Sequence, residues 1–292
     1  MTMEIIDGQF HEPSPPKDLD PKYGDDVKTL VDVELAREAL DCVGVDKALA
    51  FASQEYIDAA IARYPERFVG VVVFDHMAED LEEQIASYRS KPGCLAGRNL
   101  VGNAATAELR PEFTEGKFDR YWAFAEQYDL PLFFSTHGWA HVMSTVAERH
   151  PGLTMVIDHL GVSQSPVSPP RDEPWDQLDG LLGLAKYPNV NVKLCGAPLM
   201  SSEPYPYKDV WPHLHRVFEA FGPERILWAS DFTRMRWRPS LDVGSGSRYA
   251  PFKQWKYYSD CLNYLRDTDE ISESDKEWVF GKTVRRVLRW ED

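Results

Sequence analysis

Polar side chains stand at the ends of several short apolar runs in this chain. The clearest run is Ile226-Leu227-Trp228-Ala229-Ser230-Asp231, in which four apolar residues and a serine precede a carboxylate. The other such residues are Gln9, His11, Arg98, His137 and His159. Taken alone, Asp231 fits a helix N-cap equally well, since aspartate favours that position. The recurrence of polar ends favours one shared site.

Imidazole and carboxylate groups together support two kinds of chemistry. They can hold a divalent metal that acidifies water, or they can act without metal, with Asp231 as the base and histidines polarising a carbonyl. Arg234, Arg236 and Arg238 follow Asp231 closely, on a chain that is otherwise acidic. Guanidinium groups bind carboxylates in a bidentate manner, so we expect a small anionic substrate. Trp139 and Trp237 would supply flat apolar walls beside it.

Two further polar residues share one face of a predicted strand over residues 190–195. If Val190, Val192 and Leu194 face the helices, Lys193 and Cys195 point toward the interior. Cys195 is then expected to be a small filler rather than a nucleophile, because no base is paired with it in the pattern. The four cysteines are scattered without metal-type spacing, which favours a reduced, cytoplasmic protein.

The elements that must position these residues alternate between strand and helix. Strands are predicted at 4–8, 45–51, 68–74, 94–100, 131–137, 153–159, 190–195 and in the run ending at Asp231. Helices are predicted at 27–43, 56–64, 78–89, 118–128, 141–150, 175–187, 210–221, 254–266 and 273–288. About eight such units in roughly 250 residues predict a (β/α)8 barrel with a C-terminal helical extension. We expect one domain over residues 1–292. A doubly wound sheet is the alternative, but Gly8 alone does not make its phosphate loop.

Composition excludes several classes of partner. The formal net charge is −15, so a phosphate backbone or an anionic membrane surface would repel the chain. No apolar run approaches the length of a transmembrane helix, and the first residues lack a leader pattern. The oligomeric state stays open, with a homo-oligomer as one option.

Four stretches together resemble the amidohydrolase superfamily. They read IDGQFH at 6–11, VIDHLG at 156–161, NVNVKLCG at 189–196 and ILWASD at 226–231, with a weaker terminal GKT at 281–283. The likeness is to the amidohydrolase-related group (family 2), which includes dicarboxylate and sugar lactonases. That resemblance implies that His11, His137, His159 and Asp231 are the active-site residues, with Asp231 as the base that handles the attacking water.

The chain departs from the family pattern in its first strand. The family usually carries His-x-His there, whereas Gln9 takes the first position here, and an amide oxygen is a poor zinc ligand. Arg98 stands where a lysine would bridge two metals, so a binuclear centre is not expected. If one zinc or manganese ion binds, its expected ligands are His11, His137 and Asp231. The favoured expectation is that no metal is required and that activity survives chelation.

These observations give a leading function and two alternatives. The leading prediction is hydrolysis of a small, carboxylated lactone, or a related cyclic ester or amide, by water that Asp231 activates. The predicted substrate contacts are Gln9, Arg98, Trp139, Arg234, Arg236 and Trp237. A metal-dependent, non-oxidative decarboxylase of an aromatic acid is the enzymatic alternative, and Gln9 counts against it. The non-enzymatic alternative is a catalytically silent barrel that only binds a ligand.

Overall fold

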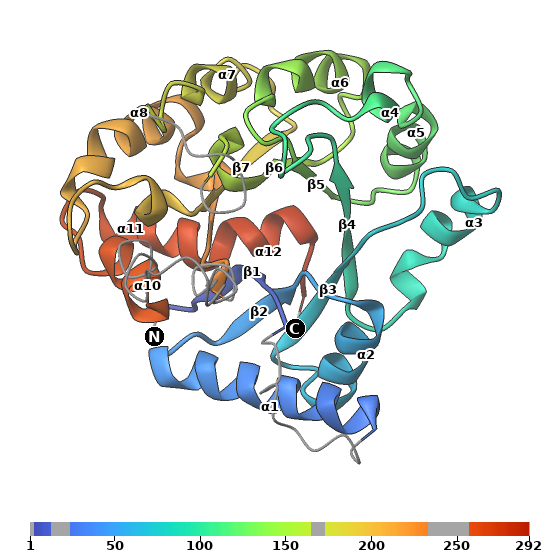
Figure 1. Cartoon of the computed structure of the whole chain (residues 1–292), viewed down its shortest axis with the longest axis horizontal. Helices are drawn as coiled ribbons and strands as arrows, with labels where there is room; N and C mark the ends of the chain where they lie inside the picture. The colour runs from blue at the N-terminus through green and yellow to red at the C-terminus, as the bar shows by residue number, and fades with distance from the viewer. Residues whose placement is uncertain (1–2, 13–23, 165–172, 233–256, 292) are drawn as a thin grey trace, which may run out of the picture.

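The predicted barrel is confirmed by a computed structural model, which describes residues 3–12, 24–164, 173–232 and 257–291. Eight parallel strands follow one another around a single sheet in chain order (Figure 1). They are β1 Ile6–Phe10, β2 Lys47–Ala50, β3 Phe68–Val72, β4 Cys94–Leu100, β5 Leu132–Ser135, β6 Met155–Ile157, β7 Val190–Cys195 and β8 Ile226–Ala229. The parallel arrangement brings the carboxyl ends of all eight strands to one mouth.

The first and last strands meet through a close backbone contact. Asp231 N donates to Gln9 O over 3.0 Å, just beyond the end of β8. Gly8 permits this approach, because a Cβ atom there would lie 2.6 Å from Trp228 O. The buried carboxylate of Asp7 accepts hydrogen bonds from Ser230 N at 2.8 Å, from the Ser230 hydroxyl, and from Tyr258 OH at 2.8 Å. Asp7 therefore links β1 to the end of β8, at the seam where the first and last strands close the barrel.

Helices surround the ring of strands, as Figure 1 shows. They are α1 Asp25–Val43, α2 Gln54–Arg63, α3 Leu81–Ala86, α4 Pro111–Thr114, α5 Asp119–Gln127, α6 Ser144–Arg149, α7 Leu178–Leu182, α8 Trp211–Phe221 and α10 Tyr258–Arg266. The main core lies between this layer and the sheet, where Trp122 of α5 and Phe134 of β5 are both fully buried. The predicted helix at 175–187 is shorter than expected, and α4 was not predicted.

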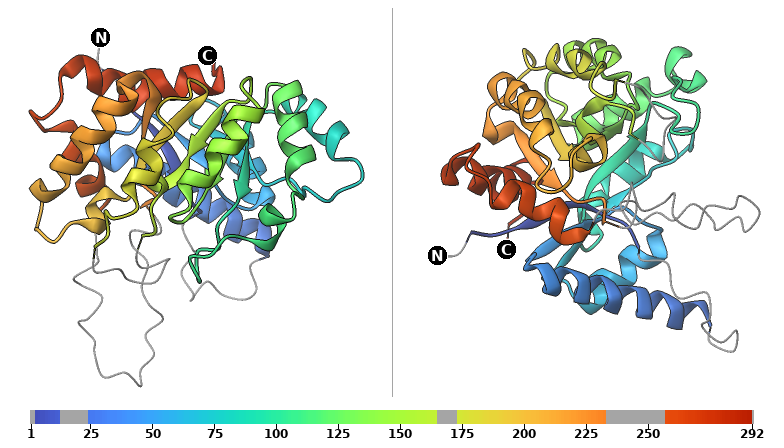
Figure 2. Two further views of the ribbon diagram at one scale, coloured as in Figure 1. Left: turned by 90° about the horizontal axis from the view of Figure 1, so that it is seen from above. Right: turned by 60° about the vertical axis from the view of Figure 1, so that its left-hand side comes forward.

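The C-terminal extension plugs the amino-terminal end of the barrel. Its helices are α11 Glu273–Glu277 and α12 Thr283–Leu288, joined by a π-helical turn over Trp278–Lys282 within the single helix that the sequence predicts. Val284, Val287 and Leu288 share an apolar cluster with inward residues of the strands, such as Val156 and Leu227. Figure 2 shows this helix at the end of the barrel where β1 begins.

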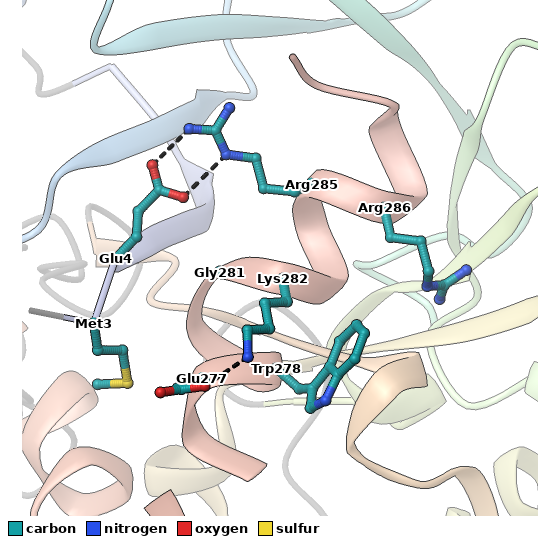
Figure 3. Close-up of a pocket in the computed structure, with 8 residues that line it drawn as sticks. All are labelled: Met3, Glu4, Glu277, Trp278, Gly281, Lys282, Arg285 and Arg286. Atoms are coloured by element: carbon teal, nitrogen blue, oxygen red, sulfur yellow. Dashed lines mark hydrogen bonds and ion pairs between the residues drawn. The ribbon is translucent and has the colours of Figure 1, made fainter. Parts of the chain in front are cut away.

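A pocket of about 550 Å³ lies at this same end (Figure 3). Four of its charged groups form two ion pairs: Arg285 donates to Glu4 through two bonds of 2.6 and 3.0 Å, and Lys282 lies 2.5 Å from Glu277. Arg286 donates instead to Asn191 and to the backbone of Glu224. The pair of Arg285 and Glu4 joins the start of the chain to its last helix, so we assign this end of the barrel to stability. Among the described residues, no helix is long and apolar enough to cross a membrane.

Candidate active site

Three candidate residues lie just beyond strands that end earlier than predicted. The strands β5, β6 and β8 stop at Ser135, Ile157 and Ala229 rather than at the polar residues that follow. His137, His159 and Asp231 instead adopt left-handed backbone angles, with φ of 46°, 54° and 51°. Such angles are uncommon outside glycine and carry a conformational cost, which proteins retain mainly at functional positions.

Four predicted residues meet at the carboxyl ends of β1, β6 and β8. Asp231 Oδ1 lies 2.9 Å from both Gln9 Nε2 and His11 Nε2. Asp231 Oδ2 lies 3.3 Å from His159 Nε2. Gln9 Nε2 in turn lies 3.0 Å from His11 Nε2 and 3.5 Å from His159 Nε2. The geometry therefore forms a compact cluster around one carboxylate.

The ring of His11 is oriented by a backbone group outside this cluster. Its Nδ1 faces the carbonyl oxygen of Phe51, which can only accept, so Nδ1 carries a proton. The other ring nitrogen, Nε2, lies 2.9 Å from Asp231 Oδ1 and 3.0 Å from Gln9 Nε2. The carbonyl of Phe51 therefore holds the ring with Nε2 directed into the cluster.

The environment of the cluster lowers the pKa values of both Asp231 and His159. Burial alone would raise the pKa of the Asp231 carboxyl, but hydrogen bonds and charge from His11 and His159 outweigh it and hold the pKa well below its ordinary value. Burial lowers the pKa of His159, against the opposing effect of Asp231. A carboxylate that remains charged in a dehydrated site can accept a proton from a bound water.

A second buried charge cluster lies beneath the first. Lys193 Nζ lies 2.6 Å from Asp158 Oδ1, while Arg98 NH2 lies 3.1 Å from Asp158 Oδ2. Burial would raise the pKa of Asp158, yet the charges of Lys193 and Arg98 lower it to about 2. Burial lowers the pKa of Lys193. The same ammonium also donates to Gln9 Oε1, which links the two clusters.

Sequence reasoning missed most of this second cluster. The inward direction of Lys193 is as expected, because it alternates with Val192 and Leu194 on β7. Asp158 was overlooked, although it directly precedes His159 within the VIDHLG stretch. The available signal was an acidic residue at the end of an apolar run, the same signal that identified Asp231. Arg98, predicted to bind substrate, is 8% exposed and engages Asp158 and the face of Phe51.

The remaining predicted residues are placed as follows. His137 Nε2 lies 2.9 Å from Ser135 Oγ, and Trp139 Nε1 donates to Ala107 O over 2.8 Å. Arg234, Arg236 and Trp237 lie outside the described residues. The substrate contacts of all these side chains stay predictions.

One group of described residues has ligand atoms close enough together for a cation. His159, Cys195 and Asp231 each offer an atom, and these atoms lie within 4.8 Å of one another. This group differs from the predicted trio of His11, His137 and Asp231. Burial raises the pKa of the Cys195 thiol well above its ordinary value. A metal bound there would have to displace the thiol proton, because metals bind the thiolate.

Comparison with known proteins adds an independent line of evidence. A family model described as amidohydrolase matches residues 6–290. An L-fucono-1,5-lactonase of Burkholderia ambifaria is 27% identical over 248 residues, which cover 82% of this chain and 80% of that protein. A 4-sulfomuconolactone hydrolase of Hydrogenophaga intermedia is 27% identical over 176 residues, covering 59% of this chain and 54% of its own length. The solved structure of an amidohydrolase from Burkholderia multivorans, with bound zinc, has a TM-score of 0.71 at 16% identity and covers 99% of this chain and 100% of that one.

Proposed function

This chain belongs to the amidohydrolase family, and from that membership we propose that it hydrolyses a small, carboxylated lactone. The observation that carries the proposal is the ionised carboxylate of Asp231, held between His11 and His159 at the mouth of the barrel. The two relatives named as a lactonase and a lactone hydrolase support the same class of reaction.

The proposed reaction uses Asp231 to remove a proton from water as its oxygen attacks the lactone carbonyl. His11 or His159 stabilises the negative charge that develops on the carbonyl oxygen, as hydrogen-bond donors do in such sites. The bond from the carbonyl carbon to the ring oxygen then breaks. The proton that Asp231 gained passes to that oxygen, and the product is a hydroxy acid. Arg98 and the arginines that follow Asp231 are proposed to hold the substrate carboxylates.

A metal ion is no part of this proposal, because the donors present fit one poorly. Zinc needs lone pairs that converge from three or four ligands at about 2.0–2.3 Å. Gln9 directs an NH2 group, which has no lone pair to offer, at Asp231 over 2.9 Å. We therefore derive no step through a metal.

Decarboxylation of an aromatic acid is the weaker alternative for the same reason. The family members that carry it out are expected to orient the substrate carboxylate with a metal, and the Gln9 amide opposes that. A silent binding barrel is also disfavoured, because Asp231 is a buried carboxylate within hydrogen-bond distance of two imidazole rings, an arrangement suited to proton transfer.

Replacing Asp231 tests the proposal directly. The Asp231→Asn variant conserves shape but cannot take a proton, so we expect kcat/KM for lactones to fall on the order of a hundredfold or more. The control is Asp179→Asn, the same change at a carboxylate that is 80% exposed on α7 and pairs with Arg216. Its activity should be unchanged. Turnover of lactones by Asp231→Asn at the unaltered rate, with native circular dichroism, would show that another group activates the water.

A further inference from the structure

We propose that Lys193 is a positioning residue that locks the Gln9 amide in one orientation, so that its NH2 group fills the centre of the site in place of a divalent cation. The proposal concerns how the site is held together, and it does not depend on which ester or amide is cleaved. Three observations carry it: the direction of the amide, the point at which its nitrogen lies, and the way in which the lysine is buried.

The direction of the amide follows from the chemistry of its partner. An ammonium group has three hydrogens and no lone pair, so Lys193 can only donate. It contacts Gln9 Oε1, which must therefore be the oxygen end of the amide. Nε2 then points the opposite way, toward Asp231 Oδ1 at 2.9 Å. The ionised Asp231 carboxylate can only accept, so it selects the same end of the amide, and the lysine and the carboxylate together hold the amide from both ends.

The nitrogen of that amide lies between the Asp231 carboxylate and two imidazole nitrogens. It is 2.9 Å from Asp231 Oδ1, 3.0 Å from His11 Nε2 and 3.5 Å from His159 Nε2. The two shorter separations are typical of hydrogen bonds, and all three exceed the roughly 2.0–2.2 Å of zinc bonds to nitrogen and oxygen. The amide thus brings the positive end of a dipole to atoms that would otherwise attract a cation.

The burial of Lys193 indicates a specific role for its charge. The side chain is 0% exposed, and placing an ammonium group in such surroundings is costly unless partners compensate. Asp158 Oδ1 lies 2.6 Å from Nζ, and Nζ lies 4.3 and 5.0 Å from the ring centres of Phe51 and Phe133. These contacts hold the ammonium group in place, and its hydrogen bond to Gln9 Oε1 in turn fixes the amide. A dication next to this ammonium would also be repelled.

Zinc content after incubation and desalting tests the replacement of the cation. We expect wild type to retain on the order of 0.1 zinc per chain or less, and Lys186→Met, which removes an exposed lysine, to behave the same way. The double variant Gln9→His/Lys193→Met supplies an imidazole and removes the repelling charge, so it should retain roughly one zinc per chain. Retention of one zinc by wild type would overturn the proposal, as would a double variant that retains none.

The side-chain amide signals of Gln9 test the role of Lys193 by NMR on glutamine-labelled protein. Their assignment comes from the pair of signals that disappears in Gln9→Met. We expect the wild-type pair to be well separated and slow to exchange, and to collapse toward the values of free glutamine in Lys193→Met. Lys193→Arg, which keeps a donor, should preserve the separation. An unchanged Gln9 pair in Lys193→Met would overturn the positioning role. Neither measurement uses a substrate, so both stand or fall separately from the proposed hydrolysis.

Discussion

Asp7 and Asp158 are both fully buried, yet the pKa values of their carboxyl groups differ from the ordinary value in opposite directions. Burial raises the pKa of Asp7 to about 6, and hydrogen bonds from Ser230, Gln9 and Tyr258 only partly oppose it. The pKa of Asp158 is lowered to about 2, because Lys193 and Arg98 bring full positive charges against the same effect of burial. Neutral donors therefore satisfy a buried carboxylate without making its ionisation favourable, whereas cations do both.

This difference matches what the two regions do. At the seam between β1 and β8, Asp7 joins backbone and hydroxyl groups, and its task is to close the barrel. Beneath the candidate site, Asp158 holds the ammonium group that orients Gln9. At the seam, Asp7 only has to accept hydrogen bonds. Beneath the candidate site, Asp158 must also compensate the positive charge of Lys193.

The largest expected effect comes from removing the negative charge at Asp158. Asp158→Asn would leave Lys193 and Arg98 buried without their counter-charge, and breaking a buried ion pair in this way costs about 3–5 kcal/mol. The measurement is the free energy of unfolding in urea at pH 7. Lys193→Met should cost less, because Asp158 keeps Arg98 as a partner. Equal losses of unfolding free energy in Asp158→Asn and Lys193→Met would mean that the shared counter-charge of Asp158 is not the source of the stability.

The dependence of stability on pH should show the two aspartates acting with opposite sign. The pKa of Asp7 is raised from 3.8 to about 6 in the folded state. Its contribution to the free energy of unfolding is therefore fully present below pH 4 and is lost as the pH rises through 6. The contribution of Asp158 is present above pH 4 and is lost as the pH falls toward 2. Raising the pKa of Asp7 from 3.8 to about 6 changes the free energy of unfolding by at most about 3 kcal/mol.

The check compares wild type with Asp7→Asn at pH values from 4 to 7. The stability advantage of wild type should shrink from pH 4 to about 6 and then level off, since only wild type has the Asp7 carboxyl to ionise. The advantage of wild type over Asp158→Asn should instead hold constant above pH 5. A wild-type advantage over Asp7→Asn that stays level from pH 4 to 7 would show that burial does not perturb Asp7.

The smallest expected effect is the loss of one neutral donor to Asp7. Tyr258→Phe removes the hydroxyl that lies 2.8 Å from Oδ2, and we expect a loss of about 0.5–1.5 kcal/mol at pH 7. The neighbouring Tyr257→Phe should leave the unfolding free energy unchanged, because Tyr257 is 61% exposed. A loss in Tyr258→Phe as large as that in Asp158→Asn would erase the distinction between donors and cations.

The sequence was sufficient to predict the barrel because its signals are local. Apolar strands alternate with amphipathic helices, and β7 was predicted with its observed bounds. The cluster of Gln9, His11, His159 and Asp231 followed from their places at strand ends. The link from Lys193 to Gln9 could not be found in this way, because it joins residues 184 positions apart and depends on which inward side chains lie at the same height. Asp158 carried a local signal, an acidic residue at the end of an apolar run, but its pairing with Lys193 and Arg98 on other strands could not be found in this way.

The left-handed turns at His137, His159 and Asp231 also limit how the site can be redesigned. In a saturation library at these positions, glycine and asparagine would meet the backbone requirement at little cost, and aspartate and histidine tolerate it. Valine, isoleucine and threonine would be eliminated before their chemistry was ever sampled. Fewer amino acids can therefore be tested for a new activity at those three positions than at Gln9. Gln9 lies within β1 and has no such backbone restriction.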